Sequence, residues 1–201
     1  LNVHTAANMG GEIRGQIQVE ADPGFYAYLT TSQETTPVMG SNAVGFAVMK
    51  ASRDKKSLWI ELIGDSLTAT PSGAHIHYGA MGMSGGVILN LSSLIDGNRI
   101  AGTLEVTPGL IDTLMSGMAY INLHTTMNPG GEIRGQINTL PVLGFDAVLD
   151  TAQETPDVMG PQNGRGVAHF HLMPTMDSLH FLVQVSGLSG AITGAHLHVG
   201  D

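Results

Sequence analysis

The sequence predicts an all-β protein, built as an antiparallel Greek-key β-sandwich or barrel that is repeated in tandem. Short apolar runs alternate with turn residues such as Gly, Pro, Asn and Ser, at the spacing typical of a sandwich or barrel. Long motifs also recur within the chain, which is the mark of a repeat architecture. Only residues 108–116 carry a helical signal, and it is short.

The repeat is direct and long. The segment LNVHTAANMGGEIRGQIQ at residues 1–18 returns as INLHTTMNPGGEIRGQIN at residues 121–138, an offset of 120. Two further landmarks return as well, AYLTTSQETTPVMG as AVLDTAQETPDVMG and GAHIHYG as GAHLHVG, at offsets of 120 and 121. Because all three landmarks recur in one order, a module of roughly 120 residues is repeated.

The order of the landmarks predicts the domain organisation. Residues 24–139 form one complete unit, residues 1–20 the C-terminal tail of a preceding unit, and residues 144–201 the N-terminal part of a following unit. A tail of twenty residues cannot bury a core alone. We therefore expect either a slice of a longer repetitive protein or a tail that completes the open half-unit of a neighbouring molecule.

Eight strands and one helical turn are expected in the complete unit. The glycines of NPGGE, at 128–132, favour a turn, so residues 120–138 are predicted to form a β-hairpin. The expected strands are 25–30, 45–51, 57–63, 73–78, 86–91, 99–106, 118–125 and 132–138.

Alternation along these strands separates the motif residues by face. Ala74, Ile76 and Tyr78 share one face, and His75 and His77 share the other. The hairpin alternates in the same way, with an aliphatic face of Ile121, Leu123, Ile133 and Ile137 and a polar face of Asn122, His124, Glu132, Arg134 and Gln136. The histidines are therefore expected on a polar face, away from the aliphatic side chains.

The histidine pattern suggests a metal site. Two imidazoles at i and i+2 on a strand project side by side, and a third from a neighbouring strand can complete a copper or zinc site. The candidate ligands are His75, His77 and His124 in the complete unit, and His196, His198 and His4 in the partial units. The alternative is that these histidines bond to backbone or carboxylate neighbours and fix the strands. His169 and His171 occur in one copy only and are expected to be a local surface feature.

Two charged residues recur within the long motif. Glu132 and Arg134, with their copies Glu12 and Arg14, are expected to form a structural ion pair or to contact a loop. One sequon, Asn90-Leu91-Ser92, makes Asn90 a candidate for glycosylation.

Composition excludes several functions. With 8 Lys and Arg against 17 Asp and Glu, the net charge of −9 argues against nucleic-acid binding. Cysteine is absent, no apolar run is long enough to span a membrane, and no nucleophile motif is present, so we expect a protein that binds or builds and is not an enzyme. Charged residues make up only 12% of the chain, so its surface is expected either to be covered by Ser, Thr, Asn, Gln and Gly or to be buried against other copies.

The same motifs resemble a known family. GAHIHYGA followed by AYINLHTTMNPGGEIRGQI, with QETTPV in front, is similar to the CHRD domain, a module first named from chordin and also found in bacterial secreted proteins. The resemblance covers nearly the whole chain and implies an extracellular or cell-surface module that occurs in tandem. GAHIHYG also has a weaker similarity to the copper-binding strand of copper/zinc superoxide dismutases, although the rest of that metal-site pattern is missing.

These observations lead to three functional hypotheses. The first is an extracellular structural or adhesive repeat protein that self-associates into a filament or surface layer. The second is a secreted copper- or zinc-binding module that uses the His-x-His pair and a third histidine. The third, implied by the resemblance to chordin, is binding of a protein ligand such as a growth factor. No cofactor other than copper or zinc is expected.

Overall fold

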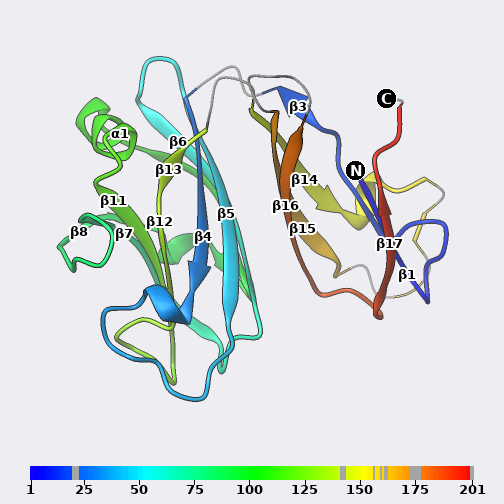
Figure 1. Cartoon of the computed structure of the whole chain (residues 1–201), viewed down its shortest axis with the longest axis horizontal. Helices are drawn as coiled ribbons and strands as arrows, with labels where there is room; N and C mark the ends of the chain where they lie inside the picture. Colours follow the sequence, from blue (N-terminus) through cyan, green and yellow to red (C-terminus); the bar gives the residue numbers. More distant parts are fainter. Residues whose placement is uncertain are drawn as a thin grey trace. The chain divides into compact units, whose positions relative to one another are not determined.

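The structure is a computed structural model of two compact units (Figure 1). Unit 1 comprises Leu1–Glu20 and Pro141–Asp201, and unit 2 comprises Ala21–Leu140. The residues described are 1–19, 23–140, 144–155, 157–158, 160, 163–172 and 178–199. No helix among these residues is long and apolar enough to cross a membrane.

Unit 2 is one antiparallel sheet that curls around its core (Figure 1). Its strands follow the order β8-β7-β11-β12-β4-β5-β6-β10-β9, and β13 also pairs with β4. The strands are β4 (Gly24–Thr30), β5 (Val44–Ala51), β6 (Ser57–Asp65), β7 (Pro71–Tyr78), β8 (Val87–Asn90), β9 (Ile95–Asp96), β10 (Arg99–Glu105), β11 (Ala119–Thr125), β12 (Ile133–Gln136) and β13 (Asn138–Thr139).

The all-β prediction is confirmed, and each of the eight expected strands is present with shifts of a few residues at its ends. Strands β4, β5 and β6 form a meander, and β12 returns from later in the chain to lie beside β4, as a Greek key requires. The expected helical turn is the helix α1 (Pro108–Met115), which Thr107 caps by accepting a hydrogen bond from the Leu110 N–H. Short 3-10 turns η1 (Thr31–Gln33) and η2 (Ser92–Leu94) follow β4 and β8.

Unit 1 joins the two ends of the described chain. Its sheet has the order β16-β15-β14-β2-β1-β17, and β3 also pairs with β14. The elements are β1 (Asn2–Thr5), β2 (Ile13–Arg14), β3 (Gln18–Val19), β14 (Gly144–Asp150), the 3-10 turn η3 (Thr151–Gln153), β15 (Arg165–Leu172), β16 (Leu179–Ser186) and β17 (Ile192–His196). Residues 1–19 and 144–199, which the sequence assigns to two different partial copies, thus share one sheet.

Each of the seven described strands of unit 1 has an equivalent in unit 2, which contains β8, β9 and β10 in addition. The order β17-β1-β2-β14-β15-β16 in unit 1 matches β7-β11-β12-β4-β5-β6 in unit 2. The N-terminal hairpin formed by β1 and β2 therefore takes the place in unit 1 that the hairpin of β11 and β12 takes in unit 2. This equivalence is the structural counterpart of the sequence repeat.

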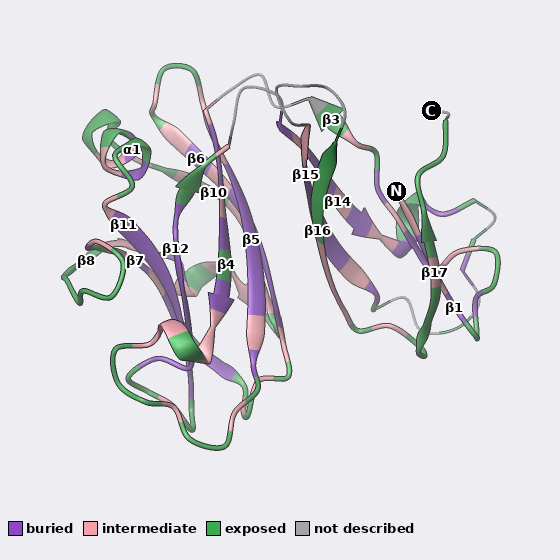
Figure 2. Cartoon of the chain, in the orientation of Figure 1, coloured by how far each residue is buried: buried purple, intermediate pink, exposed green. Residues whose placement is uncertain are grey.

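The cores form as the alternation predicts (Figure 2). Ala74, Ile76, Ile121, Leu123 and Ile133 are fully buried inside the curled sheet of unit 2. Side chains on the opposite, polar face of β12 are buried as well, since Arg134 and Gln136 are only 2% and 8% exposed. The polar face is thus covered by other parts of the unit and is not simply solvated.

The core of unit 2 supplies a first test. Truncation of a fully buried isoleucine removes apolar contacts and leaves a cavity, so Ile133→Ala should lower the free energy of unfolding of unit 2 by about 2–5 kcal/mol. Fluorescence of Trp59, the single tryptophan, during chemical denaturation reads out this unit. The control Val87→Ala, at a side chain that is 53% exposed, should change stability by less than about 0.5 kcal/mol. Equal effects of the two substitutions would contradict the assignment of the core.

Candidate metal centre

Three histidines of unit 2 converge on the outer face of the sheet. His75 and His77 project from β7, and β7 pairs with β11 so that Asn122 lies opposite His75 and His124 lies opposite Gly73. One ring nitrogen from each histidine lies within 4.8 Å of the other two. The structure therefore brings together the three side chains that the sequence singled out, and all three are partly exposed.

The glycine of the GAHxH motif lies beside two of the imidazoles. A β-carbon at Gly73 would lie 3.4 Å from the His75 ring and 3.7 Å from the His124 ring, which are ordinary contact distances. The Nδ1 of His75 lies 3.0 Å from the Nε2 of His124, so these two rings meet next to Gly73.

The nitrogen spacing fits a bound ion. Two imidazole nitrogens that each lie about 2.0–2.1 Å from one ion stand roughly 2.9–3.4 Å apart when the bond angle is about 90–110°. The separation of 3.0 Å between His75 and His124 falls in this range. An N–H···N hydrogen bond has a similar length, so the distance alone does not distinguish the two arrangements.

The partners of the other ring nitrogens favour the ion. The Nδ1 of His77 lies 3.0 Å from the carbonyl oxygen of Gly85, and the Nδ1 of His124 lies 3.0 Å from that of Pro129. Since a carbonyl only accepts, both Nδ1 atoms carry the proton, and in the neutral rings both Nε2 atoms present lone pairs to the centre. The Nε2 of His77 is buried and has no hydrogen-bond partner. A hydrogen bond between His75 and His124 leaves this atom unsatisfied, whereas a shared ion would satisfy all three.

Electrostatics favours the neutral, metal-binding form of His75 and His124. Burial lowers the pKa of His75, and the neighbouring His77 lowers it further. Burial also lowers the pKa of His124, more than the bond to Pro129 raises it. Because neutral imidazole is the ligand form, the lowered pKa values favour coordination near neutral pH.

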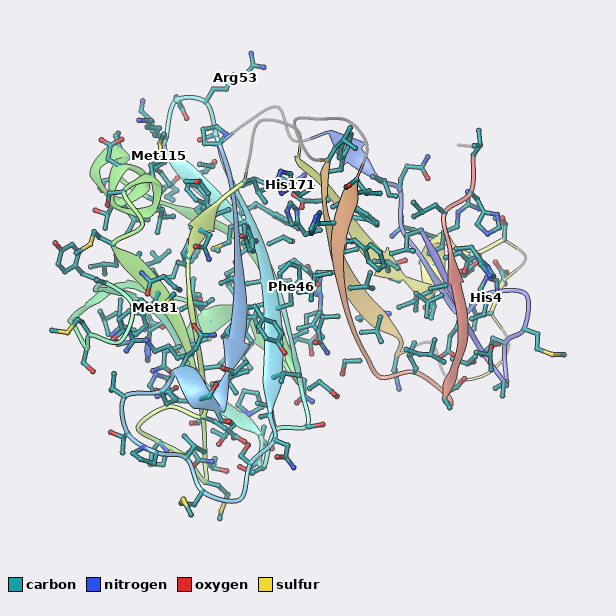
Figure 3. All side chains as sticks on the ribbon, viewed as in Figure 1. His4, Phe46, Arg53, Met81, Met115 and His171 are labelled. Carbon is teal, nitrogen blue, oxygen red and sulfur yellow. The ribbon has the colours of Figure 1, made fainter. Side chains whose placement is uncertain are left out.

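Unit 1 repeats the centre with histidines from the two ends of the described chain. His4 on β1 and His196 at the end of β17, with His198 just beyond it, place their ligand nitrogens within 4.8 Å of one another. The Nε2 of His4 lies 3.3 Å from the Nδ1 of His196, and the Nδ1 of His4 donates to the carbonyl of Met9 at 3.0 Å. His4 lies opposite Gly194, as His124 lies opposite Gly73. Figure 3 marks the position of His4 in unit 1.

A buried glutamate holds the turn that positions the third histidine. Glu132 is fully buried, and its carboxylate accepts hydrogen bonds from the Thr125 hydroxyl at 2.6 Å and the Ser41 hydroxyl at 2.7 Å. It also accepts from the backbone N–H and the hydroxyl of Thr68, at 2.8 and 3.0 Å. These bonds fix the turn between β11 and β12, whose Pro129 carbonyl orients His124.

Arg134 holds the loop that positions the second histidine. Its Nη2 donates to the carbonyls of Ala80 and Met83, at 3.3 and 2.6 Å, and its guanidinium lies 3.4 Å from the ring centre of Tyr120. The same loop contains Gly85, whose carbonyl orients His77. Of the two roles expected for this arginine, contact to a loop is therefore the one observed.

The expected ion pair between the two motif residues is not formed. Glu132 is held by hydroxyl and backbone groups, and Arg134 by carbonyls and an aromatic ring. The equivalent residues of unit 1 also have separate partners. Glu12 accepts hydrogen bonds from Thr5, Asn8 and Ser189, whereas Arg14 donates to Thr155. Both carboxylates are completely buried, and neutral hydroxyl and N–H donors satisfy their lone pairs without a counter-ion.

Sequence reasoning missed two residues on or beside the polar strand face, of which Tyr120 contacts the centre. The ring of Tyr120 stacks on the imidazole of His77, with ring centres 4.9 Å apart and an interplanar angle of 6°. Burial raises the pKa of Glu34 to about 7, although Arg134 and a hydrogen bond from Asn122 oppose the shift. Tyr120 lies on the same strand face as His124, so alternation could have identified it, but nothing local to Glu34 indicates its contact with Asn122.

The two remaining candidates have separate environments. His169 was expected at the surface, but it is only 7% exposed, and its Nδ1 lies 3.1 Å from the carboxylate of Asp146 on the neighbouring strand. Its ring packs toward Asp146 because the two residues are direct cross-strand partners. Asn90 is exposed, and its side-chain carbonyl accepts a hydrogen bond from the Ser92 N–H. Glycosylation at Asn90 stays a prediction.

Comparison with known proteins identifies one family. The family model of the CHRD domain matches residues 25–137 and again residues 145–201. No curated protein and no solved structure matches the chain significantly. The two matched segments correspond to unit 2 and to the larger part of unit 1.

The buried carboxylate of Glu132 generates a pH prediction. Burial alone would raise its pKa, but the hydrogen bonds from Thr125, Ser41 and Thr68 outweigh burial and hold the pKa below 4.5. Its stabilising effect is therefore present above about pH 4.5 and is lost as the pH falls through the folded-state value. Glu132→Gln should lower the free energy of unfolding by about 1–3 kcal/mol at pH 7, and the difference should shrink on acidification.

Denaturation followed by Trp59 fluorescence at pH 7 and at pH 3.5 measures this difference. Glu105→Gln, at an exposed carboxylate, is the matched control and should have almost no effect at either pH. A Glu132→Gln defect of the same size at both pH values would show that the charge of Glu132 is not what stabilises the fold.

Proposed function

The chain belongs to the CHRD domain family, and from that premise and the two histidine clusters we propose that it is an extracellular β-rich protein that binds copper or zinc, with one site in each unit. CHRD domains occur in secreted proteins, which supports the extracellular setting. The observation that carries the metal proposal is the buried, unpartnered Nε2 of His77, which points to a centre that two other imidazoles already share.

The protein's residues would have two roles in metal binding, as ligands and as groups that orient the ligands. His75, His77 and His124 would supply three nitrogen ligands, and the carbonyls of Gly85 and Pro129 would fix two of the rings in the required tautomer. Copper or zinc held by three imidazoles keeps a coordination position for water or another donor. The ligands come from two strands of one sheet, so a bound ion would also cross-link β7 to β11.

Metal content after dialysis tests the proposal. The wild-type chain, equilibrated with Zn²⁺ or Cu²⁺ and dialysed, should retain one ion per three-histidine site by elemental analysis. The double variant His75→Ala/His77→Ala should lose the ion of unit 2 and keep that of unit 1. The variant His196→Ala/His198→Ala should show the reverse.

His180→Ala is the matched control, because this exposed histidine belongs to neither cluster. It should retain the wild-type metal content. If the wild-type chain retains no stoichiometric metal, or if both double variants retain as much as wild type, the metal proposal is wrong.

A second function, assembly into an extracellular filament or layer, is favoured by a separate observation. Unit 1 is completed by a hairpin that precedes the rest of the unit by more than a hundred residues of chain. A sheet completed by a segment that is distant in sequence is the arrangement through which strand donation links subunits. The low content of charged residues, 12%, also favours burial of surface between copies.

Electron microscopy at increasing protein concentration tests assembly directly. We expect filaments or ordered layers, with the unit repeat visible along them. Single particles of uniform size at high concentration would contradict this second function and would leave the metal proposal intact.

A further inference from the structure

The contact between the two chain segments of unit 1, called here the joint, suggests how metal binding and assembly are connected. The N-terminal hairpin, defined here as residues 1–19, docks on a receptor surface formed by the described residues between 144 and 199. In the docked state β1 lies between β2 and β17, with Asn2 opposite His196 and Val3 opposite Ala195. The chain between the hairpin and the receptor surface passes through the whole of unit 2.

The docked hairpin is tightly integrated. Val3 and Ile13 are 1% and 0% exposed and belong to the core cluster of unit 1, together with Leu149 and Phe170. The buried carboxylate of Glu12 accepts from the backbone N–H and the hydroxyl of Ser189, at 2.6 and 2.7 Å. Undocking would expose apolar side chains and break these hydrogen bonds, so the empty receptor surface needs an equivalent hairpin.

Another copy of the chain can supply that hairpin. The hairpin side of these contacts lies within residues 1–19, so a hairpin from a second molecule would make the same contacts with the receptor surface. Within one chain, residues 121–138 perform the equivalent role in unit 2, which shows that the fold uses this hairpin as a modular part. Whether docking occurs within or between molecules is then set by effective concentration, and not by the contacts themselves.

The candidate metal site of unit 1 lies across this joint. His4 comes from the hairpin, whereas His196 and His198 come from the receptor surface. An ion that requires all three ligands binds only the docked state, so its binding free energy adds to the stability of docking. The site is the same whether His4 comes from the same molecule or from another. The ion would therefore slow release of the hairpin equally for docking within one molecule and docking between two.

We propose that residues 1–19 exchange between copies of this chain and that a metal ion shared by His4, His196 and His198 locks each hairpin in place. This inference rests on the proposed metal function. The partner is a second copy of the chain, whose His4 would replace the chain's own His4 beside His196 and His198. Metal binding would thus determine when hairpins that join two molecules stop exchanging.

Energy transfer between two labelled populations tests the exchange. The chain has no cysteine, so one population carries a donor dye at Ala7→Cys and the other an acceptor dye at Ala191→Cys, both at exposed positions beside the β1–β17 pairing. Transfer arises only when the hairpin of one molecule docks on the other. After mixing without metal, transfer should grow with time. Saturation of both populations with Zn²⁺ before mixing should slow its growth at least tenfold.

Matched variants assign the effect to one site. With His4→Ala in both populations, transfer should grow at the metal-free rate whether or not Zn²⁺ is present. His124→Ala, the equivalent change in unit 2, should preserve the slowing. Because His4→Ala could weaken docking by itself, His198→Ala, at an exposed receptor position, provides a second test with the hairpin sequence intact.

The outcomes separate the two levels of inference. Absence of transfer in the metal-free mixture would refute exchange. Equal rates with and without Zn²⁺, in a chain whose metal content shows both sites filled, would refute the lock and leave the metal function standing. A chain that retains no zinc would refute the metal function and the lock together.

Discussion

The arrangement of each unit depends on one buried carboxylate. Glu132 in unit 2 and Glu12 in unit 1 are both completely buried, and each gathers hydroxyl and N–H donors from the hairpin turn and from a neighbouring loop. A buried charge of this kind is stable only when hydrogen bonds satisfy its lone pairs. The carboxylate therefore ties the turn to the rest of the unit, and the turn fixes the third histidine.

The recurrent motif GGEIRGQI supports the histidine cluster from two sides. Its glutamate fixes the turn that orients His124, and its arginine fixes the loop that orients His77. Gln136 adds to the second support by donating to the carbonyls of Gly79 and Gly117. Glu132 and Arg134 of this motif thus hold the turn and the loop whose carbonyls fix the tautomers of two candidate ligands.

The two units reach the same architecture from different chain connectivity. Unit 2 uses a continuous segment, whereas unit 1 uses two segments that flank unit 2 in the sequence. The strands of unit 1 have the same order and pairing as their equivalents in unit 2, so this part of the sheet forms with either connectivity. This independence allows a hairpin to act as a separable part and places one histidine of unit 1 on each side of a joint.

The sequence by itself determined the strands of unit 2, the repeat and the three histidines of each cluster, because alternation and recurrence are local and can be read along the chain. It did not determine the partners of Glu132 and Arg134, which come from loops centred far away in sequence, such as those of Thr68 and Met83. Nor did it show that residues 1–19 complete the sheet of residues 144–199. Such contacts are set by which strands become neighbours in the closed sheet, and only the tertiary structure decides that order.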